Sequence, residues 1–285
     1  MLISIIIPVY KNQHYLSFSL ASVLNQTYTN LEIIIINDGE KDDSKILNII
    51  KIQRKQIPIR YFKLKKNFGV AYALNYGIRK SKGELINWLS HDDYFHKDKL
   101  RQQINFMIKN KCMVCYTSFF LINDQKQKLY SSKIRFFSPE ISILVRDNVN
   151  FCTLLINKKV FDNVGLFNDD LKHTQDYDMM YRIFSIYDPK YLNIPLFFSR
   201  IHHFQNSKLY KDVSANEKVN LLMSKKKVLI KVFNSSNLFH KLLILFFFSR
   251  RKLHSINHFL IESLDSYAYY FIFKLYLMLS KLINS

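Results

Sequence analysis

The chain has 285 residues, of which 48% are hydrophobic and 15% aromatic, with only five glycines and five prolines. This length fits one large α/β domain with an appendage or two small domains, and the composition excludes a long disordered chain. The formal net charge is +20, and the stretch from Arg200 to Ser285 carries 14 Lys and Arg against 4 Asp and Glu. These basic residues alternate with Phe, Leu and Ile and accompany no nucleic-acid-binding module. The pattern favours an anionic membrane surface over nucleic acid as a partner.

The cysteines and the N-terminus favour a cytoplasmic protein. Three cysteines cannot all pair, and no leader with a basic start, an apolar middle and a cleavage site precedes Ser4. Cys112 and Cys115 form a CxxC pattern, but a redox or zinc site needs a helix start or a second ligand pair nearby, and neither is evident. We therefore expect buried apolar cysteines next to a strand.

The first part of the chain alternates short β-branched runs with amphipathic segments. This alternation predicts a parallel sheet with right-handed crossovers, which binds ligands beyond the carboxyl ends of its strands. The expected strands are 3–9, 32–36, 59–63 and 85–89, and the expected helices are 14–26, 42–54 and 69–81.

The second part has a mixed pattern. It predicts a helix over 97–110, strands over 113–121 and 151–156, helices near 158 and after 176, and a helical, basic and apolar region beyond about 206. The expected organisation is a domain over 1–207, with halves 1–95 and 96–207, followed by a region over 208–285. Charges interrupt every apolar run of that last region before the ~20 residues that a membrane span needs. Peripheral membrane attachment and packing against the chain's own core or another subunit both remain open.

Carboxylates gather at three expected strand or helix ends. Asp38 follows the second strand, where it could bind a ribose or base, although Asp-Gly is often only a turn. Asp92 and Asp93 follow the fourth strand, where adjacent carboxylates favour a bridging divalent cation over a simple helix cap. Asp176 and Asp178 stand at a helix start, where capping explains one carboxylate and leaves the other for chemistry.

These segments together resemble the family 2 glycosyltransferases of the GT-A fold. The resemblance is ordered and spans roughly residues 3–207. It rests on Ser4-Ile-Ile-Ile-Pro-Val-Tyr-Lys-Asn12, Leu20-Ala-Ser-Val-Leu-Asn-Gln-Thr-Tyr28, Leu31-Glu-Ile-Ile-Ile-Ile-Asn-Asp-Gly39, Asn67-Phe-Gly-Val-Ala-Tyr-Ala-Leu-Asn75, Lys82-Gly-Glu84, the Asp92-Asp93 pair, Phe161-Asp-Asn-Val-Gly-Leu-Phe167 and Gln175-Asp-Tyr-Asp178.

The resemblance implies a role for each matching residue. Asp176 would be the catalytic base, and Asp92 and His202 would hold Mn²⁺ or Mg²⁺. His202 belongs to an Arg-x-His-x-x-Gln-x-Ser run, for which a hydrogen-bonded structural pair with His203 is the alternative. The residues expected to bind the donor are Pro8, Tyr10, Asp38, Asn67, Asn75, Asp93 and Arg200.

Three departures from the family pattern bear on these roles. Ser90 replaces the first Asp of the usual Asp-x-Asp metal motif, which leaves fewer anionic ligands. Gln175 stands where many members have Glu, and Leu74 stands where Arg is frequent, so an additional phosphate clamp is not expected.

The implied reaction is inverting transfer of a sugar from a nucleotide diphosphate sugar, most simply a UDP-hexose. The sugar would go to a hydroxyl of a surface-glycan or lipid-linked acceptor. The half over 1–95 would bind the nucleotide sugar, and the half over 96–207 would hold the acceptor. Cations would neutralise the leaving diphosphate while Asp176 takes the acceptor's proton. We expect a cytoplasmic location, with attachment to the inner face of the cytoplasmic membrane as an option. The alternative is a catalytically silent nucleotide-sugar-binding module that assembles at a membrane. A dinucleotide dehydrogenase is disfavoured because Pro8-Val-Tyr-Lys-Asn12 lacks the glycines that its phosphate turn needs.

Overall fold

The structure is a computed structural model that describes residues 1–11, 13–53, 57–131 and 149–202, together with Glu217, Lys227, Val228 and Lys231. His203 lies outside the described residues, and so does the expected region over 208–285 apart from these four. The expected domain boundaries therefore stay predictions.

The N-terminal half forms the predicted parallel sheet. Its strands are β1 (Ile3–Val9), β2 (Leu31–Asn37), β3 (Ile59–Lys63) and β4 (Leu85–Trp88), in the spatial order β3-β2-β1-β4. All three strand pairs are parallel, and Ile5 of β1 lies opposite Ile33 of β2 and Asn87 of β4. Every residue of β2 is buried, as expected for a strand covered on both faces of a sheet.

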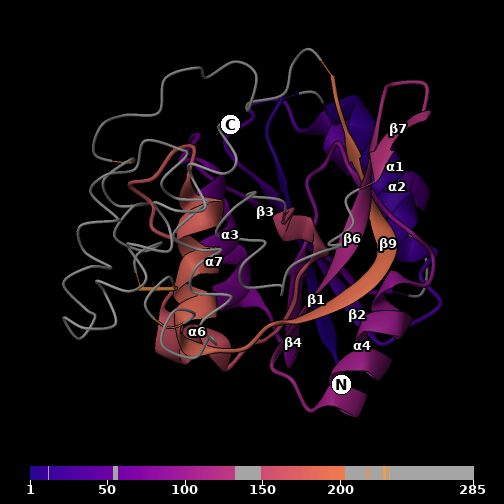
Figure 1. The fold of residues 1–285 in the computed structure, drawn as a ribbon. Coiled ribbons are helices and arrows are strands. Elements are labelled where there is room, and N and C mark those ends of the chain that lie inside the picture. The colour runs from indigo at the N-terminus through magenta and orange to yellow at the C-terminus, as the bar shows by residue number, and fades with distance from the viewer. Residues whose placement is uncertain are drawn as a thin grey trace, which may run out of the picture.

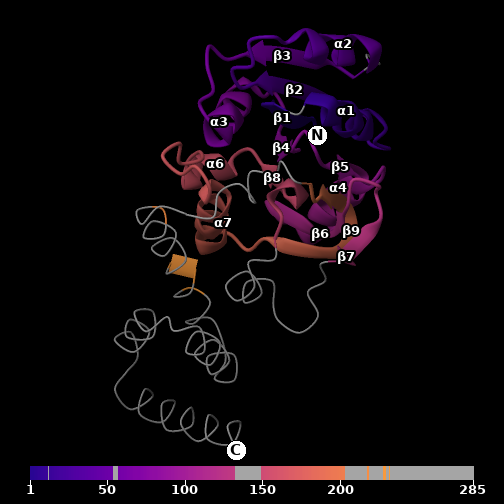
Figure 2. The same cartoon turned by 90° about the horizontal axis from the view of Figure 1, so that it is seen from above.

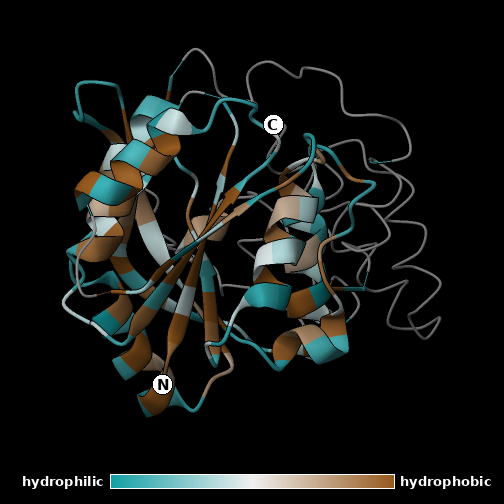
Figure 3. Cartoon of the chain, turned by 180° about the vertical axis from the view of Figure 1, so that it is seen from behind, coloured by the Kyte–Doolittle hydropathy of each residue, from teal (hydrophilic) through white to brown (hydrophobic). Residues whose placement is uncertain are grey.

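Helices cover both faces of this sheet. Figures 1 and 2 show α1, α2 and α4 on one face and α3, α6 and α7 on the other. In the hydropathy view of Figure 3, the central strands are largely hydrophobic, and the helices carry both hydrophobic and hydrophilic surfaces. The helical elements are η1 (Gln13–Tyr15), α1 (Leu16–Leu24), α2 (Ser44–Gln53), α3 (Val70–Lys80), α4 (Lys99–Asn110), η2 (Phe151–Thr153), α6 (Val160–Val164) and α7 (Gln175–Ile186).

The second half extends the same sheet with mixed pairing. Beyond β4 the order continues β8-β6-β9-β5, and β7 pairs with β6. Strand β8 runs antiparallel to β4 and β6, β9 runs parallel to β6, and β5 runs antiparallel to β9. The strands are β5 (Tyr94–Phe95), β6 (Val114–Ile122), β7 (Lys128–Ser131), β8 (Leu155–Asn157) and β9 (Lys190–Arg200). The fold class is the predicted one, an α/β protein with helices on both faces of a central sheet, which is parallel in its first four strands and mixed in the rest.

Two details differ from the sequence prediction. Residues 151–156 do not form one strand, because the Asn150 side chain accepts a bond from the Cys152 N–H (2.9 Å) and caps the 3₁₀-helix η2, which leaves only the end of the segment for β8. The long strand β9 was not predicted. Its register shifts around Ser118, where Pro195 stands opposite, and proline lacks the N–H that a regular ladder needs.

The expectation of buried cysteines holds for Cys115 but not for Cys112. Cys115 lies in β6 and Cys152 in η2, both buried, while Cys112 is half-buried, and none forms a disulfide. Within the residues that the structure describes, no helix combines the length and apolar character needed to cross a membrane.

Candidate active site

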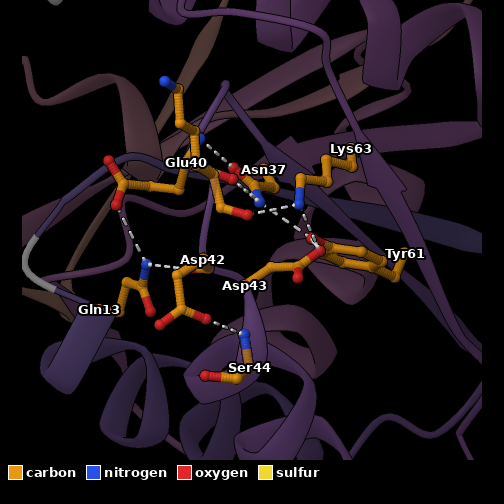
Figure 4. A network of polar contacts seen from close by, with 9 residues as sticks. Gln13, Asn37, Glu40, Asp42, Asp43, Ser44, Tyr61 and Lys63 are labelled. Carbon is orange, nitrogen blue, oxygen red and sulfur yellow. Dashed lines mark hydrogen bonds and ion pairs between the residues drawn. The ribbon is translucent and has the colours of Figure 1, made fainter.

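A polar network fixes the loop that follows β2 at the carboxyl edge of the sheet (Figure 4). The Asn37 amide donates to the Glu40 carbonyl (3.1 Å) and to the Tyr61 hydroxyl (2.9 Å), and Tyr61 donates to Asp43 Oδ2 (2.8 Å). Lys63 of β3 forms an ion pair with the same Asp43 oxygen (3.1 Å). The ends of β2 and β3 therefore hold the loop over 38–44 in one conformation.

Asp38 ties this loop to the start of α3. Its two carboxylate oxygens accept the backbone N–H groups of Phe68 (2.8 Å) and Gly69 (3.0 Å). Burial raises the pKa of Asp38, and the two N–H bonds oppose that rise. The loops approach so closely that a Cβ on Gly39, which has φ +88°, would lie 2.2 Å from the Asn67 nitrogen. Asp38 therefore holds the loop after β2 against the loop before α3.

Asp92 and His202 meet directly although they are 110 residues apart. His202 Nε2 lies 2.9 Å from Asp92 Oδ2, and the side chains are 3% and 17% exposed, respectively. Burial works to raise the pKa of Asp92, but the hydrogen bond to His202 and the nearby imidazoles outweigh it and hold that pKa below its usual range. The pair combines an anionic oxygen with an imidazole nitrogen at the end of the strand β4.

Asp93 and Arg200 connect the turn that carries Asp92 to the end of β9. Asp93 Oδ1 accepts the Arg200 backbone N–H (2.7 Å), and Arg200 Nε donates to the Asp92 carbonyl (3.0 Å). Burial and the neighbouring Asp92 charge raise the pKa of Asp93 well above its ordinary value. These bonds join the turn after β4 to the end of β9, so the structure brings together four residues that were singled out from the sequence.

Tyr15, His91 and Asp124 also lie at this site, and the sequence did not indicate them. The Arg200 guanidinium stacks over the Tyr15 ring (5.1 Å to its centroid), whose hydroxyl donates to Asp124 Oδ1 (3.0 Å). The Tyr15 ring also lies 5.0 Å from the His202 ring. Burial lowers the pKa of His91, while the Asp92 charge and a bond to the Pro8 carbonyl oppose that decrease. The position of Tyr15 in the segment after β1 was the only sequence signal that could have pointed to it. Asp124 lies in a turn after β6, and the sequence offered no signal for its place at the site.

Asp176 stands in the first turn of α7. Burial raises its pKa to about 6. Its charge and that of Asp93 both act to raise the pKa of the Cys152 thiol, whose Sγ lies 3.7 Å from Ser90 Oγ. A carboxylate with a pKa near 6 is suited to accept a proton at neutral pH.

The two neighbours of Asp176 have different environments. Asp178 pairs with Arg182 (Nη2 to Oδ2, 2.8 Å), and Arg182 also donates to the carbonyls of Val164 and Leu166. Asp178 is therefore the structural carboxylate of the two that the sequence left open. Gln175 is buried, and its Oε1 has no hydrogen-bond partner among the residues that the structure describes.

The remaining predicted donor-binding residues divide into two groups. Asn75 is buried in α3, where its amide donates to the Phe167 carbonyl (2.9 Å) and to Asp169, and its oxygen accepts the Phe167 N–H. These bonds give Asn75 a place in the scaffold, away from the strand ends. Pro8 and Tyr10 are half-buried at the end of β1, and Asn67 is exposed beside Gly39. All three remain candidates for donor contact.

The residues at the site suit a cation that a substrate helps to bind. Among the described residues, no group of three or more His, Cys, Asp and Glu side chains is arranged to hold a metal. Asp92 and His202 offer one oxygen and one nitrogen, and Mg²⁺ sites of phosphate-transferring enzymes commonly use one or two carboxylates with substrate phosphates as the other ligands. The pair therefore fits a metal whose remaining ligands come from a diphosphate.

Comparison with known families assigns the chain to one of them. The profile described as "Glycosyl transferase family 2" matches residues 4–165, more than half of the chain. The chain belongs to this family. The match includes β1, Asp38, the turn with Asp92 and Asp93, and η2, whereas Asp176, Arg200 and His202 lie beyond it.

Curated relatives carry the same assignment. A protein of Rickettsia typhi named as an uncharacterized glycosyltransferase is 37% identical over 72% of this chain and 66% of its own length. One from Rickettsia felis is 38% identical over 78% of this chain but 38% of its own length, so the chain spans only part of these relatives. The Escherichia coli protein WfgD, named as a UDP-Glc:alpha-D-GlcNAc-diphosphoundecaprenol beta-1,3-glucosyltransferase, is 34% identical over 43% of this chain and 47% of its own length.

Solved structures show the same fold at low sequence identity. S. aureus TarS 1-349 in complex with UDP-GlcNAc superposes with a TM-score of 0.66 and 17% identity, over 86% of this chain and 70% of the TarS 1-349 chain. A mannosyltransferase from Pyrobaculum calidifontis in complex with GDP-Man and Mn²⁺ gives a TM-score of 0.56 and 12% identity, over 85% of this chain and 78% of the enzyme. These likenesses establish the GT-A type of fold.

Proposed function

We propose that the protein is an inverting, metal-dependent glycosyltransferase that moves a sugar from a nucleotide diphosphate sugar to a hydroxyl group. The observation that carries the proposal is the contact of Asp92 with His202 beside buried Arg200 at the carboxyl edge of the sheet. The raised pKa of Asp176 in α7 supports it. The family assignment supports the reaction class. Fold alone would not, because one fold serves many chemistries.

The leaving diphosphate is the part of the reaction that needs positive charge. Asp92 and His202 would hold Mn²⁺ or Mg²⁺, which would act as a Lewis acid on the diphosphate oxygens. Arg200 lies 2% exposed, with its side chain bonded to the Asp92 and Asp124 carbonyls, so it presents a fixed positive charge at the same place. A preorganised charge of this kind stabilises the developing anion without reorganisation.

The acceptor hydroxyl needs a base on the other side of the anomeric carbon. Asp176 fits because burial raises its pKa to about 6, so that the carboxylate is ionised at neutral pH and still basic enough to take a proton. It stands in the first turn of α7. Attack in line on one face, with departure from the other, gives a single displacement and inversion.

Hydrolysis of UDP-glucose and UDP-N-acetylglucosamine, with and without Mn²⁺, tests the proposal. We expect Mn²⁺-dependent release of UDP, with losses of about 100-fold or more for Asp176→Asn and Asp92→Ala. Asp170→Asn changes an exposed carboxylate near the same helix and serves as the matched control. If both site variants hydrolyse the donors as fast as the unaltered protein, the site assignment is wrong.

The donor, the acceptor and the location are the finer parts of the proposal. A UDP-hexose donor is supported by the names of WfgD and of the TarS complex, and a lipid-linked acceptor by the name of WfgD. A surface glycan and an enzyme on the inner face of the cytoplasmic membrane follow from such an acceptor and from the excess of basic residues after Arg200. Salt-sensitive binding of the full chain to vesicles with anionic lipids checks the location. Equal binding to neutral vesicles would refute it.

The alternative of a silent nucleotide-sugar-binding module rests on Ser90 in place of an acidic residue. Its hydroxyl lies 3.7 Å from the Cys152 thiol, so it contributes no charge to the site. UDP that stabilises the protein against thermal unfolding in the absence of any donor hydrolysis would favour this alternative.

A further inference from the structure

One carboxylate from the C-terminal part of the chain holds the segment that leads into α7. Glu217 is 5% exposed, and its Oε1 accepts the Lys172 N–H (3.0 Å). Its Oε2 accepts the His173 N–H (3.2 Å) and the Thr174 hydroxyl (3.1 Å). Three successive residues are thus fixed by a side chain that lies more than 40 positions further along the chain.

These bonds take the place of an ordinary helix cap. Thr174 is the N-cap residue of α7, but its side chain makes no capping bond to the helix, because its hydroxyl is directed to Glu217. A carboxylate near the first turn of a helix also interacts favourably with the helix dipole. Burial opposes ionisation of Glu217, yet the bonds from 172–174 and the charge of His173 outweigh it and hold the pKa of Glu217 below its usual value.

A second residue from the same part of the chain holds the other end of α7. Lys231 Nζ donates to the carbonyls of Phe184 (3.1 Å) and Tyr187 (2.6 Å) and to Asp188 Oδ1 (2.6 Å). A cation at the C-terminal end of a helix satisfies its last carbonyls and matches the dipole. Val228, which lies between Glu217 and Lys231 in the sequence, is fully buried. The Glu217 carboxylate therefore contacts the segment before α7, and the Lys231 ammonium group contacts the end of α7.

We infer that Glu217 is a positioning residue for Asp176, which stands two residues after Thr174 at the start of α7. The inference rests on the proposed function, because it concerns the residue proposed as the base. Glu217 bonds to the segment before the base, and acts by fixing where α7 begins. Lys231 braces the end of α7 that is remote from the base and contributes to stability alone.

The pair of contacts provides a matched experiment on the full chain. Glu217→Gln removes the charge and one of the two acceptor oxygens that hold 172–174, and Lys231→Met removes the contact at the other end of α7. We expect both to lower the melting temperature. Only Glu217→Gln should reduce kcat for UDP-glucose or UDP-N-acetylglucosamine hydrolysis, by about 10- to 100-fold, because small displacements of a catalytic group have effects of that size. Its protection by UDP against thermal unfolding should stay unchanged, since the strand-end loops are untouched.

The pH profile gives a readout that a purely structural role would not change. If the start of α7 loosens, Asp176 becomes better solvated and its pKa returns toward its ordinary value, so the acid limb of kcat should move to lower pH. Among groups near Asp176, the Cys152 thiol has its pKa raised by burial and is neutral in this range. Lys231→Met should leave both kcat and the acid limb in place.

Each result bears on one proposal. Unchanged kcat and an unchanged acid limb in Glu217→Gln, while Asp176→Asn is inactive, would overturn the positioning role and leave the proposed function intact. Full activity of Asp176→Asn would refute the proposed function itself. If Glu217→Gln does not fold, Thr174→Ala removes one of the three bonds, and the same fall in kcat with the same shift of the acid limb is expected. Unchanged values in that variant would equally overturn the inference.

Discussion

Asp176→Asn should make the protein more stable while it removes activity. The ordinary carboxyl pKa is 3.8, and burial raises that of Asp176 to about 6. At about 1.4 kcal/mol per pKa unit, ionising Asp176 in the folded protein costs about 3 kcal/mol. The side chain is partly exposed, so solvent screening makes this figure an upper limit. Asparagine has nearly the same shape and no charge to bury.

The pH dependence of this effect has a definite sign. Between about pH 4 and 6 the folded protein binds a proton at Asp176 that the unfolded chain releases, so stability falls as the pH rises through this range. Above about pH 6 the penalty is complete. Asp176→Asn should therefore exceed the unaltered protein in free energy of unfolding by up to ~3 kcal/mol at pH 7, and the two should converge near pH 4.

Urea unfolding at several pH values measures the difference, and a rise in melting temperature of ~2–4 °C per kcal/mol accompanies it. The matched control is Asp178→Asn on the same helix, which breaks the 2.8 Å ion pair with Arg182 and should lower stability by about 2 kcal/mol. Donor hydrolysis should fall by about 100-fold or more in Asp176→Asn. A loss of stability in both variants would refute the assignment of Asp176 as a chemically active carboxyl group whose ionisation lowers stability.

Three other substitutions test the scaffold of the site. Gly39→Ala should lower stability by about 2 kcal/mol more than Gly69→Ala, because both residues have positive φ but only Gly39 faces backbone atoms, at 2.2 Å. Equal losses in urea unfolding would contradict this. Glu32→Gln should cost about 2 kcal/mol, because the buried carboxylate accepts bonds from Ser4 (2.6 Å) and Arg60 (3.1 Å), and the difference from the unaltered protein should shrink as low pH protonates Glu32. Burial lowers the pKa of Lys99 to about 7, so the unaltered protein should gain stability as the pH rises from about 7 to 10, and Lys99→Met should lack this gain in thermal unfolding.

The sequence predicted the first half of the fold because each signal there is local. The run Ile3–Val9 is β1 to the residue, and β2, β3 and α3 lie within a residue or so of the predicted ranges. A strand buried on both faces must be continuously apolar, and its helix must show an apolar stripe, so the pattern and the structure have the same cause. The family resemblance, confirmed by the profile match, added the order of the segments.

The parts that the sequence did not give depend on distant partners. β9 contains Asn193 and Pro195 and lacks regular alternation, and it is a strand because β6 offers a shifted register that accommodates the proline. Tyr15 joined the site only because the end of β9 places Arg200 and His202 against its ring. Likewise, nothing local to Asn75 shows that its amide is consumed by the backbone of Phe167. Contacts between segments cannot be read from the spacing within one segment.

The two pairs of acidic residues show how such contacts divide chemistry from scaffold. In each pair one carboxylate is anchored, Asp93 by the Arg200 backbone at 2.7 Å and Asp178 by the Arg182 side chain at 2.8 Å. The other member is the one proposed for chemistry: Asp92 lies against an imidazole, and burial raises the pKa of Asp176. The anchored member fixes the turn or helix from which its neighbour projects, and a rigid support of this kind is what a catalytic group requires. It follows that Asp→Asn should lower stability at an anchored position such as Asp178, whereas at Asp176 it should lower turnover while stability rises.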